Sequence, residues 1–222
     1  MSRRRVLVAA LGFAASAALP AAPAFAQAPS SHRHRFGNAE RWAQVFDDPK
    51  RDVWQKPDDV LRALALAPDA VVADLGAGTG YFAVRLARVL PTGRVYGVDI
   101  EPDMVRYLGD RAKREHLDNI VALQGTRDDP NLPEKVDLIL LVDVYHHIDE
   151  REQYFRSLGD DLSAGGRIAI IDFRPDSPTG PPTNARIPAD RVKDELKRAG
   201  YALTQEHTFL PNQYFLVFER AG

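Results

Sequence analysis

The sequence contains no cysteine, which excludes disulfide bonds, thiolate metal sites and a thiol nucleophile. Neither sign of charge is in excess, because 29 lysine and arginine residues face 31 aspartate and glutamate residues. This balance indicates neither a nucleic-acid partner nor an anionic membrane partner. With 222 residues, 45% of them hydrophobic, the chain has the size of one domain with a buried core.

Long hydrophobic runs are also scarce, and the most apolar stretch lies at the start of the chain. Residues 3–5 are arginines, residues 6–18 are uncharged and rich in alanine, and residues 24–26 read Ala-Phe-Ala. This order is typical of a secretory signal peptide, and the apolar stretch is short compared with the roughly 20 residues of a membrane span. We expect residues 1–26 to be cleaved, which would leave no stable membrane anchor.

The arginine segment also resembles a twin-arginine export signal. The sequence therefore predicts an exported, periplasmic protein; the alternatives are an uncleaved anchor, or a misassigned start and a cytoplasmic protein. Residues 27–69 are predicted to form a linker and N-terminal helices, with helices at 39–46 and 57–66. The segment Trp54–Pro57 between these helices is a candidate lid.

From residue 70 to residue 222, short apolar runs alternate with helical patterns. Strands are expected at residues 71–75, 94–99, 120–124, 136–142 and 166–173, and helices at 80–90, 103–116, 151–162 and 188–199. This alternation predicts right-handed βαβ crossovers and a parallel sheet. Two further strands, at 201–206 and 213–219, follow each other so closely that we expect them to be antiparallel.

The stretch VVADLGAGTG, residues 71–80, joins the first strand to the first helix of this core. At such a turn the backbone faces the ligand crevice of an open α/β sheet, and glycines allow a tight bend and close approach of a ligand. The spacing is G-x-G-x-G, whereas a dinucleotide fingerprint reads G-x-G-x-x-G. Asp74 before the turn would repel a pyrophosphate but pair with a cation. An NAD-dependent oxidoreductase is therefore disfavoured.

The second expected strand ends in Asp99, about 20 residues after the glycines, where nucleotide sites place a carboxylate that accepts hydrogen bonds from ribose hydroxyls. Asp99 would alternatively cap the next helix, since Pro102 lies at its start, and the two roles are compatible. The turn and Asp99 together predict a ligand with a ribose and a positively charged, amino-acid-like part. S-adenosylmethionine has both.

The segments DLGAGTG and GVDIEPDM resemble the first two motifs of the class I S-adenosylmethionine-dependent methyltransferases. VDLILLVDVYHHID and LSAGGRIAIIDF resemble the fourth-strand and fifth-strand motifs of that family, and the small-molecule branch with quinone and arsenite methyltransferase-like domains is the most similar. The resemblance implies a Rossmann-like three-layer α/β/α sandwich. Its mostly parallel seven-stranded sheet would have an antiparallel last strand.

The resemblance also implies which residues bind the cofactor. The first motif would line its methionine part, Asp99 would hold the ribose, and two apolar side chains would flank the adenine. Near the usual adenine-binding aspartate this chain has a threonine, with Asp128 slightly further on, which leaves that contact open. The implied cofactor residues are Asp74, Gly76, Gly78, Gly80, Asp99, Ile100, Met104, Thr126 and Asp143. Asp143 would lie near the methionine amino group or the transferring methyl, or would alternatively bind loop amides.

Tyr145, His146 and His147 follow the fourth strand and are the candidate catalytic residues. Methyl transfer from a sulfonium mainly requires alignment, and a histidine near neutrality suits an acceptor that must lose a proton. One histidine would otherwise pack or cap the following helix, and adjacent side chains point in different directions. We therefore expect at most one histidine in the site, with Tyr145 shaping the pocket.

A small-molecule methyl acceptor is the expected partner, and no nucleic acid is expected. Its pocket would take in Trp54, Phe173, Arg174 and Tyr214. Arsenite is disfavoured as the acceptor because the chain lacks the thiolates that would hold arsenic. No metal site is expected, since no metal-binding spacing occurs. The oligomeric state stays open.

Export creates a difficulty, because the methyl donor is made in the cytoplasm. The second hypothesis is therefore an exported cofactor-binding or ligand-binding protein that has the methyltransferase fold and no turnover.

Overall fold

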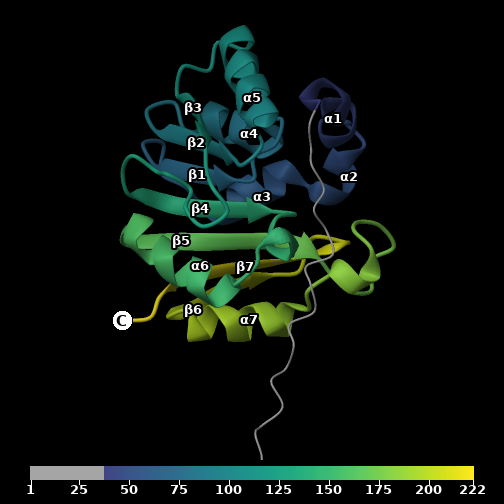
Figure 1. Cartoon of the computed structure of the whole chain (residues 1–222), viewed down its shortest axis with the longest axis vertical. Coiled ribbons are helices and arrows are strands. Elements are labelled where there is room, and N and C mark those ends of the chain that lie inside the picture. The colour runs from purple at the N-terminus through teal and green to yellow at the C-terminus, as the bar shows by residue number, and fades with distance from the viewer. Residues whose placement is uncertain (1–37) are drawn as a thin grey trace, which may run out of the picture.

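The structure is a computed structural model, and it describes residues 38–222. The predicted signal peptide and most of the predicted linker lie outside the described residues. One seven-stranded sheet runs through the centre, in the order β3-β2-β1-β4-β5-β7-β6 (Figure 1). Its strands are β1 (Val71–Leu75), β2 (Arg94–Asp99), β3 (Ile120–Gln124), β4 (Val136–Val142), β5 (Leu162–Phe173), β6 (Tyr201–His207) and β7 (Gln213–Arg220).

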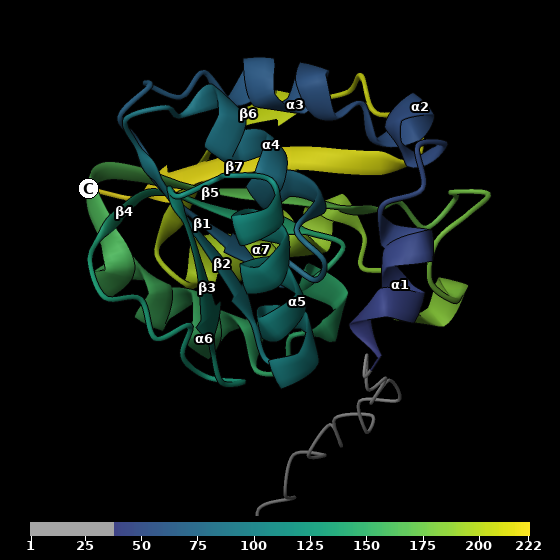
Figure 2. The same cartoon turned by 90° about the horizontal axis from the view of Figure 1, so that it is seen from above.

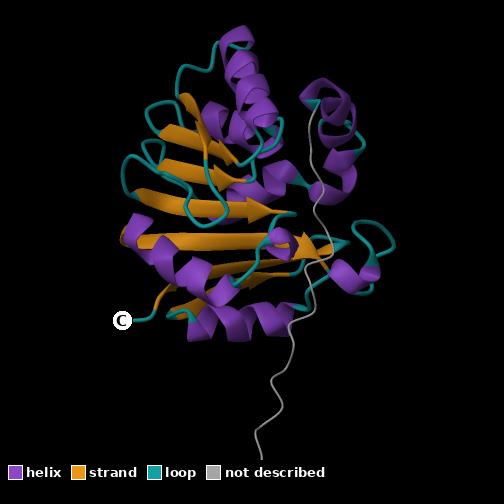
Figure 3. Ribbon diagram, in the orientation of Figure 1, coloured by secondary structure: helices purple, strands orange, loops and turns teal. Residues whose placement is uncertain are grey.

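The first five strands pair in parallel, and β7 is antiparallel to both β5 and β6. Helices flank the strands on both faces (Figure 3). They are α1 (Ala39–Phe46), α2 (Arg51–Gln55), α3 (Pro57–Leu64), α4 (Tyr81–Val89), α5 (Pro102–Arg114), α6 (Arg151–Leu158) and α7 (Ala189–Arg198), with 3-10 turns η1 (Tyr145–His147), η2 (Gly159–Asp161) and η3 (Thr183–Ala185). The predicted fold class, a mostly parallel α/β/α sandwich with an antiparallel last strand, is confirmed.

The side chains of β4 show why its sequence is apolar at nearly every position. Leu138 and Leu140 pack in the cluster formed with α3, α4 and α5, whereas Ile139 and Leu141 pack in the cluster formed with α6 and α7. Figure 2 shows α3 and α4 on one side of the sheet and α6 on the other. A central strand covered on both faces has no solvent side, so the usual alternation of polar and apolar residues disappears.

The N-terminal region differs from the prediction by one helix. The sequence predicts helices at 39–46 and 57–66, and the structure adds α2 between them, in the segment expected as a lid. Lys56 separates α2 from α3 with a left-handed backbone, φ 45°, and Pro57 then starts α3. Two short helices with a sharp bend have no long periodic pattern, which explains why the sequence shows only the longer pieces.

The helices α1 and α2 lie beyond the carboxyl ends of the parallel strands, and we call them the N-terminal lid (Figure 1). Polar contacts hold this lid on α5. Ala39 N donates to Asp103 Oδ2 at 2.6 Å, and Arg111 Nη1 lies 2.9 Å from Asp47 Oδ1. The lid therefore covers the edge of the sheet where the predicted site lies.

No helix between residues 38 and 222 has the length and apolar composition to cross a bilayer.

A buried ionic network joins α6, α7 and η1. Glu195 is 6% exposed and accepts hydrogen bonds from Arg151 Nε at 2.6 Å, Arg191 Nε at 2.8 Å and the Tyr145 hydroxyl at 2.5 Å. Burial raises the pKa of Glu195, but the hydrogen bonds from these partners outweigh it and lower the pKa to about 2. The carboxylate therefore stabilises the fold above its ordinary pKa of 4.5, and this contribution disappears as the pH falls towards 2.

Replacing Glu195 by glutamine is expected to lower the free energy of unfolding by about 2–3 kcal/mol at neutral pH, since it leaves Arg151 without its counter-ion. The difference from wild type should shrink as the pH falls below 4.5, because the wild-type carboxylate is then protonated during unfolding. Urea unfolding across this pH range measures both effects. Glu206→Gln, which breaks an exposed pair with Lys193, is the matched control and should change little.

Candidate functional site

The glycine turn between β1 and α4 is shaped first by the packing of the chain on itself. Gly76 and Gly80 have φ of 70° and 92°, a region that glycine adopts readily. A Cβ on Gly76 would lie 2.4 Å from a methyl group of Val144, and one on Gly80 would lie 2.5 Å from a methyl group of Leu108. Packing therefore accounts for these two glycines, whereas the sequence interpretation attributed Gly80 to a ligand. At Gly78 a Cβ would meet the ring of Phe46 at 3.4 Å, so the lid lies over the turn.

The acidic residue that precedes the turn is buried and incompletely bonded. Asp74 is 3% exposed, and its Oδ2 atom has no hydrogen-bond partner. Burial raises the pKa of Asp74 to about 7, although the amide of Ala83 and the charge of Arg51 oppose the shift. Thr79 Oγ1, in the turn itself, is also buried without a partner. Native proteins seldom leave such atoms unpaired, so both indicate a place for a polar ligand.

Asp99 connects the end of β2 to the glycine turn. Its Oδ2 atom accepts from Gly78 N and its Oδ1 atom accepts from Glu101 N, both at 2.9 Å. Each oxygen keeps a second lone pair, so these contacts are compatible with a ribose. Burial raises the pKa of Asp99. The N-cap of α5 is Glu101, and no side chain caps that helix, so the alternative role of Asp99 as its cap is wrong. The bond to Glu101 N holds the turn before the helix.

The residues predicted around the adenine lie in different environments. Ile100 is 46% exposed at the end of β2, whereas Met104 is 1% exposed in the first turn of α5. Thr126 Oγ1 accepts hydrogen bonds from the amides of Asp128 and Asp129, at 3.3 and 3.0 Å, and so stabilises its own loop. The adenine contact stays a prediction for all three.

Asp143 follows β4 with a left-handed backbone, φ 60°, which is uncommon for a residue with a side chain. Its Oδ2 atom lies 3.3 Å from Arg51 Nη2 of the lid, and its Oδ1 atom accepts from Gln213 Nε2 at 2.5 Å. Burial raises the pKa of Asp143 against the charge of Arg51. A strained backbone that holds a carboxylate at a strand end is typical of a functional position.

The structure distinguishes the two candidate histidines. His146 Nδ1 lies 3.0 and 2.9 Å from the two carboxylate oxygens of Asp172, near the end of β5, and His146 N donates to Asp172 Oδ2 at 3.2 Å. The two side chains are 5% and 2% exposed. A carboxylate that accepts from Nδ1 leaves Nε2 to accept a proton. Sequence reasoning missed Asp172, although it lies near a strand end like the other site aspartates.

Neighbouring negative charges determine whether the pKa of His146 is raised or lowered. Burial lowers it, but the hydrogen bond and the charge of Asp172, together with the charge of Asp143, outweigh burial and raise it above 6.5. The ring of His147 lies against that of His146, with 4.1 Å between the centroids. A proton-transfer role for His147 stays a prediction.

Tyr145 lies in the core, away from the predicted pocket-lining place. It is fully buried, packs against Phe155 at 5.4 Å between ring centroids, and donates its hydroxyl hydrogen to Glu195. The three residues Tyr145–His147 form the 3-10 turn η1, whose geometry of three residues per turn sends neighbouring side chains in different directions. We therefore assign Tyr145 a structural contact.

The expected acceptor pocket is assembled in part. The rings of Trp54 and Phe173 lie 5.6 Å apart, which brings the lid to the end of β5. Tyr214 pairs with Asp172 across β5 and β7, and its hydroxyl is buried without a partner. Arg174 donates to the carbonyls of Leu210 and Gln213, at 3.0 and 3.1 Å, so it holds the loop before β7.

The buried polar side-chain atoms without a partner gather at one edge of the sheet. In the described residues they are Asp74 Oδ2, Thr79 Oγ1 and the Tyr214 hydroxyl. Asp74 lies near the end of β1, Thr79 lies in the turn that follows, and Tyr214 pairs with Asp172 near the end of β5. This is the edge where open α/β sheets bind ligands. The residues present therefore fit a ligand with several polar groups. No group of three or more potential metal ligands occurs between residues 38 and 222.

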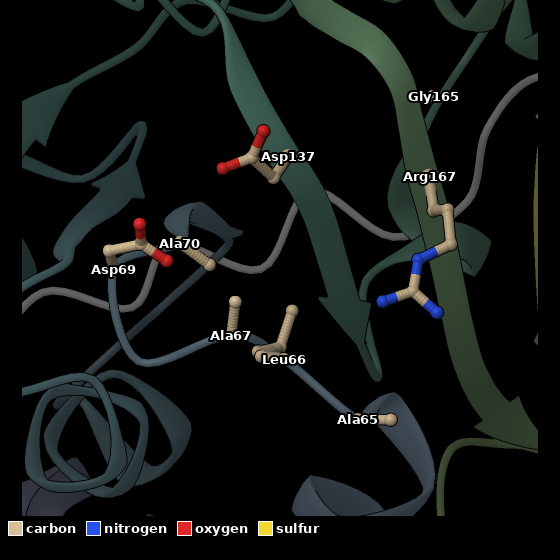
Figure 4. Close-up of a pocket in the computed structure, with 8 residues that line it drawn as sticks. All are labelled: Ala65, Leu66, Ala67, Asp69, Ala70, Asp137, Gly165 and Arg167. Atoms are coloured by element: carbon tan, nitrogen blue, oxygen red, sulfur yellow. The ribbon is translucent and has the colours of Figure 1, made fainter.

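A depression of about 340 Å³ lies at the opposite edge of the sheet (Figure 4). Asp137 in its wall accepts from Val71 N at 2.9 Å and from Ser163 Oγ at 2.6 Å, and Arg167 donates to Leu64 O at 2.7 Å. These polar groups are already used by the fold, so the depression carries no functional assignment.

Comparison with known proteins identifies the family. The family model described as "Methyltransferase domain" matches residues 66–220, more than half of the chain, and the chain therefore belongs to this family. Among solved structures, a SAM-dependent methyltransferase from Aquifex aeolicus has a TM-score of 0.75 at 22% identity, covering 82% of this chain and 97% of that one. Magnesium protoporphyrin IX methyltransferase from Synechocystis PCC 6803, with bound SAH, has a TM-score of 0.64 at 19% identity, covering 82% and 93%.

Among curated relatives, the arsenite methyltransferase of Halobacterium salinarum is 30% identical over 151 residues, which are 62% of this chain and 38% of that protein. The chain spans 27% to 44% of the length of the first three curated relatives. The structural likenesses, at 22% identity or less, establish the fold alone.

Proposed function

We propose that this protein transfers a methyl group from S-adenosylmethionine to a small-molecule acceptor whose reacting atom must lose a proton. The observation that carries the proposal is the His146–Asp172 pair beside the Asp74, Asp99 and Asp143 carboxylates, at one edge of the sheet. Family membership supports the reaction class, and the small-molecule relatives support the acceptor class.

The chain's own residues would divide the work. Asp99 would hold the ribose, while Asp74 and Asp143 would face the charged amino-acid part. When bound, S-adenosylmethionine supplies a methyl group activated by its sulfonium charge. His146 Nε2 would take the proton from the acceptor, and Asp172 would keep the imidazole oriented through Nδ1. The lid would exclude water from the crevice.

Arsenite is not the acceptor that we propose, even though one relative is an arsenite methyltransferase. The chain has no cysteine to hold arsenic, and the proposed base is a histidine. A hydroxyl, an acidic N–H or an acidic C–H compound suits that base better.

The test has two arms. Calorimetry with S-adenosylmethionine, its demethylated product and NAD is expected to show binding of the first two only. Transfer of labelled methyl to the small-molecule fraction of a cell extract then separates an enzyme from a binding protein without turnover. Binding without transfer to any fraction would support the binding-protein alternative.

Replacing Asp99 by alanine is expected to weaken binding of S-adenosylmethionine by about 1–3 kcal/mol, since a charged acceptor of hydrogen bonds is lost. Calorimetry measures the change. Asp110→Ala, which removes an exposed carboxylate of α5 that pairs with Arg106, is the control and should bind like wild type. Unchanged affinity in the Asp99 variant would remove this residue from the site.

Export is a separate part of the proposal, supported by the charge and hydrophobicity pattern of residues 1–26. N-terminal sequencing of the protein recovered from its cell is expected to find a mature chain that begins near Gln27. A full-length chain in the cytoplasm would contradict export and leave the proposed chemistry untouched.

A further inference from the structure

Tyr214, the second residue of β7, has a hydroxyl group that the fold does not use. The side chain is 5% exposed, and its hydroxyl oxygen is buried without a hydrogen-bond partner. Two other buried tyrosines differ in this respect. Tyr145 donates its hydroxyl hydrogen to Glu195, and Tyr201 donates to the carbonyl oxygen of Phe155 at 2.9 Å. A buried hydroxyl without a hydrogen bond lowers stability, so the hydroxyl of Tyr214 needs a reason other than folding.

The register of the sheet brings Tyr214 next to the pair formed by His146 and Asp172. Strand β7 is antiparallel to β5, and Tyr214 is the direct partner of Asp172. Directly opposite residues of an antiparallel pair have their side chains on the same face, with Cβ atoms about 5 Å apart. Because β5 lies between β4 and β7 (Figure 1), His146 after β4 and Tyr214 on β7 flank Asp172 from opposite sides.

The carboxylate of Asp172 is already bonded to other groups. Its Oδ1 atom accepts from the amide of Phe173 at 2.7 Å, and its Oδ2 atom accepts from the amide of His146 at 3.2 Å. His146 Nδ1 lies 3.0 and 2.9 Å from the same two oxygens. Burial, together with the negative charges of Asp172 and Asp143, raises the pKa of Tyr214 well above its ordinary value. The hydroxyl of Tyr214 therefore keeps its hydrogen and is a neutral donor outside this set of bonds.

The spacing of the strands indicates what the donor would meet. Neighbouring strands lie about 4.8 Å apart, so the end of β4 and the start of β7 are separated by roughly 10 Å. Side chains at that separation meet opposite ends of a one-ring molecule more readily than a single atom of it. His146 Nε2 would accept the proton of a hydroxyl group at one end, and Tyr214 would donate to an oxygen at the other. A carbonyl conjugated with the hydroxyl also makes that hydroxyl acidic enough for a histidine base.

We propose that the methyl acceptor is a conjugated hydroxy-carbonyl compound whose carbonyl oxygen accepts a hydrogen bond from the Tyr214 hydroxyl. This inference rests on the proposed function and deepens it by naming the class of acceptor. When the O–H bond of the acceptor breaks, the proton goes to His146 Nε2 and the electron pair stays on the acceptor. Conjugation spreads the negative charge onto the carbonyl oxygen. The hydrogen bond from Tyr214 therefore strengthens as the acceptor becomes a nucleophile.

Methyl transfer to two phenols tests the inference. 4-Hydroxyacetophenone has a hydroxyl and a conjugated carbonyl at opposite ends of one ring, whereas 4-ethylphenol has the hydroxyl alone. The measured quantity is the ratio of their kcat/KM values, which should favour 4-hydroxyacetophenone in the wild-type protein. Tyr214→Phe removes only the hydroxyl group and is expected to lower this ratio by roughly 10- to 100-fold, the effect of a hydrogen bond to a charged group.

Tyr201→Phe is the matched control, because it removes a buried hydroxyl that the fold uses. It should lower the urea midpoint of unfolding and leave the ratio of the two phenols at the wild-type value. Tyr214→Phe should keep or raise the midpoint, since its hydroxyl has no partner in the free protein. The two readouts thus separate a contact with the acceptor from a structural role.

An unchanged ratio in Tyr214→Phe would overturn the inference, and so would an equal loss for both phenols. A wild-type protein that binds S-adenosylmethionine but methylates neither phenol would also overturn it, and the proposed function would stand. A wild-type protein that does not bind S-adenosylmethionine would instead contradict the proposed function. The two failures are therefore distinguishable.

Discussion

Replacing His146 by glutamine is expected to lower kcat by about 10²- to 10⁴-fold, the range that a positioned general base contributes. Glutamine keeps a polar side chain of similar reach next to Asp172 but cannot take a proton. Binding of S-adenosylmethionine should stay close to wild type, because the proposed cofactor contacts come from other residues. Single-turnover methyl transfer and calorimetry measure the two quantities. His147→Gln is the control from the same 3-10 turn, and a larger loss there would assign the base to His147 instead.

The pH profile gives an independent readout of the same pair. Only neutral imidazole accepts a proton, so kcat/KM should rise with pH through the pKa of His146, which lies above 6.5. Asp172→Asn removes the charge that most strongly opposes burial, so the pKa of His146 should fall and the acid limb should move to lower pH. The same variant should lower kcat, because the imidazole loses its orienting carboxylate. A lower kcat with an unmoved acid limb would contradict this role of Asp172.

Replacing Asp143 by asparagine is expected to weaken S-adenosylmethionine binding roughly 10- to 100-fold, because the variant leaves Arg51 without its counter-ion and removes the partner of the ligand's positive charge. Arg51→Ala combined with Asp143→Asn should cost less than the sum of the single effects, since the two side chains form one unit. Calorimetry on all three variants completes this cycle. Strict additivity would mean that the two residues bind the ligand independently.

The pH dependence of binding follows from the same carboxylates. Burial raises the pKa of Asp74 to about 7, so a proton occupies much of this group below that pH and removes its attraction for a cation. Affinity for S-adenosylmethionine should therefore rise through about pH 7 and then level off, by up to tenfold per pH unit for each group that ionises. S-adenosylhomocysteine keeps the ammonium group that Asp74 would face and should show a similar rise. An affinity that does not change across this pH range would argue against a direct charge effect.

The strands, most helices and the edge that carries the site could be predicted from the sequence, because each depends on a local pattern. The turn at Gly76 and the acid Asp99 lie beside apolar runs of a clear period, and their place at a strand end follows from the parallel sheet. Asp172 shared this signal, since it is part of the quoted fifth-strand motif, but only its distance to His146 gives it a role.

No local sequence pattern predicts the hydrogen bonds that join Arg51, Gln55, Gln213 and Asp143. These residues lie far apart in the chain, because Asp143 comes 92 positions after Arg51 and Gln213 comes 158 positions after Gln55. Polar residues at such separations carry no periodicity, and only the folded backbone shows that they meet. For Tyr145, in contrast, the local sequence did predict a place in the pocket. Its neighbours along the chain suggested a site, but the 3-10 geometry turns it into the core towards Glu195.

The reversed direction of β7 separates two kinds of truncation experiment. Because β7 runs against β5, its first residues, Gln213 and Tyr214, reach the edge where the parallel strands finish. A truncation from the C-terminus would remove most of β7, an inner strand of the sheet, before it removed Gln213 and Tyr214. Loss of ligand binding in such a variant would therefore reflect unfolding. Trimming through α2 removes Arg51 and leaves the sheet whole. Truncation from the N-terminus can consequently test ligand binding separately from the stability of the sheet.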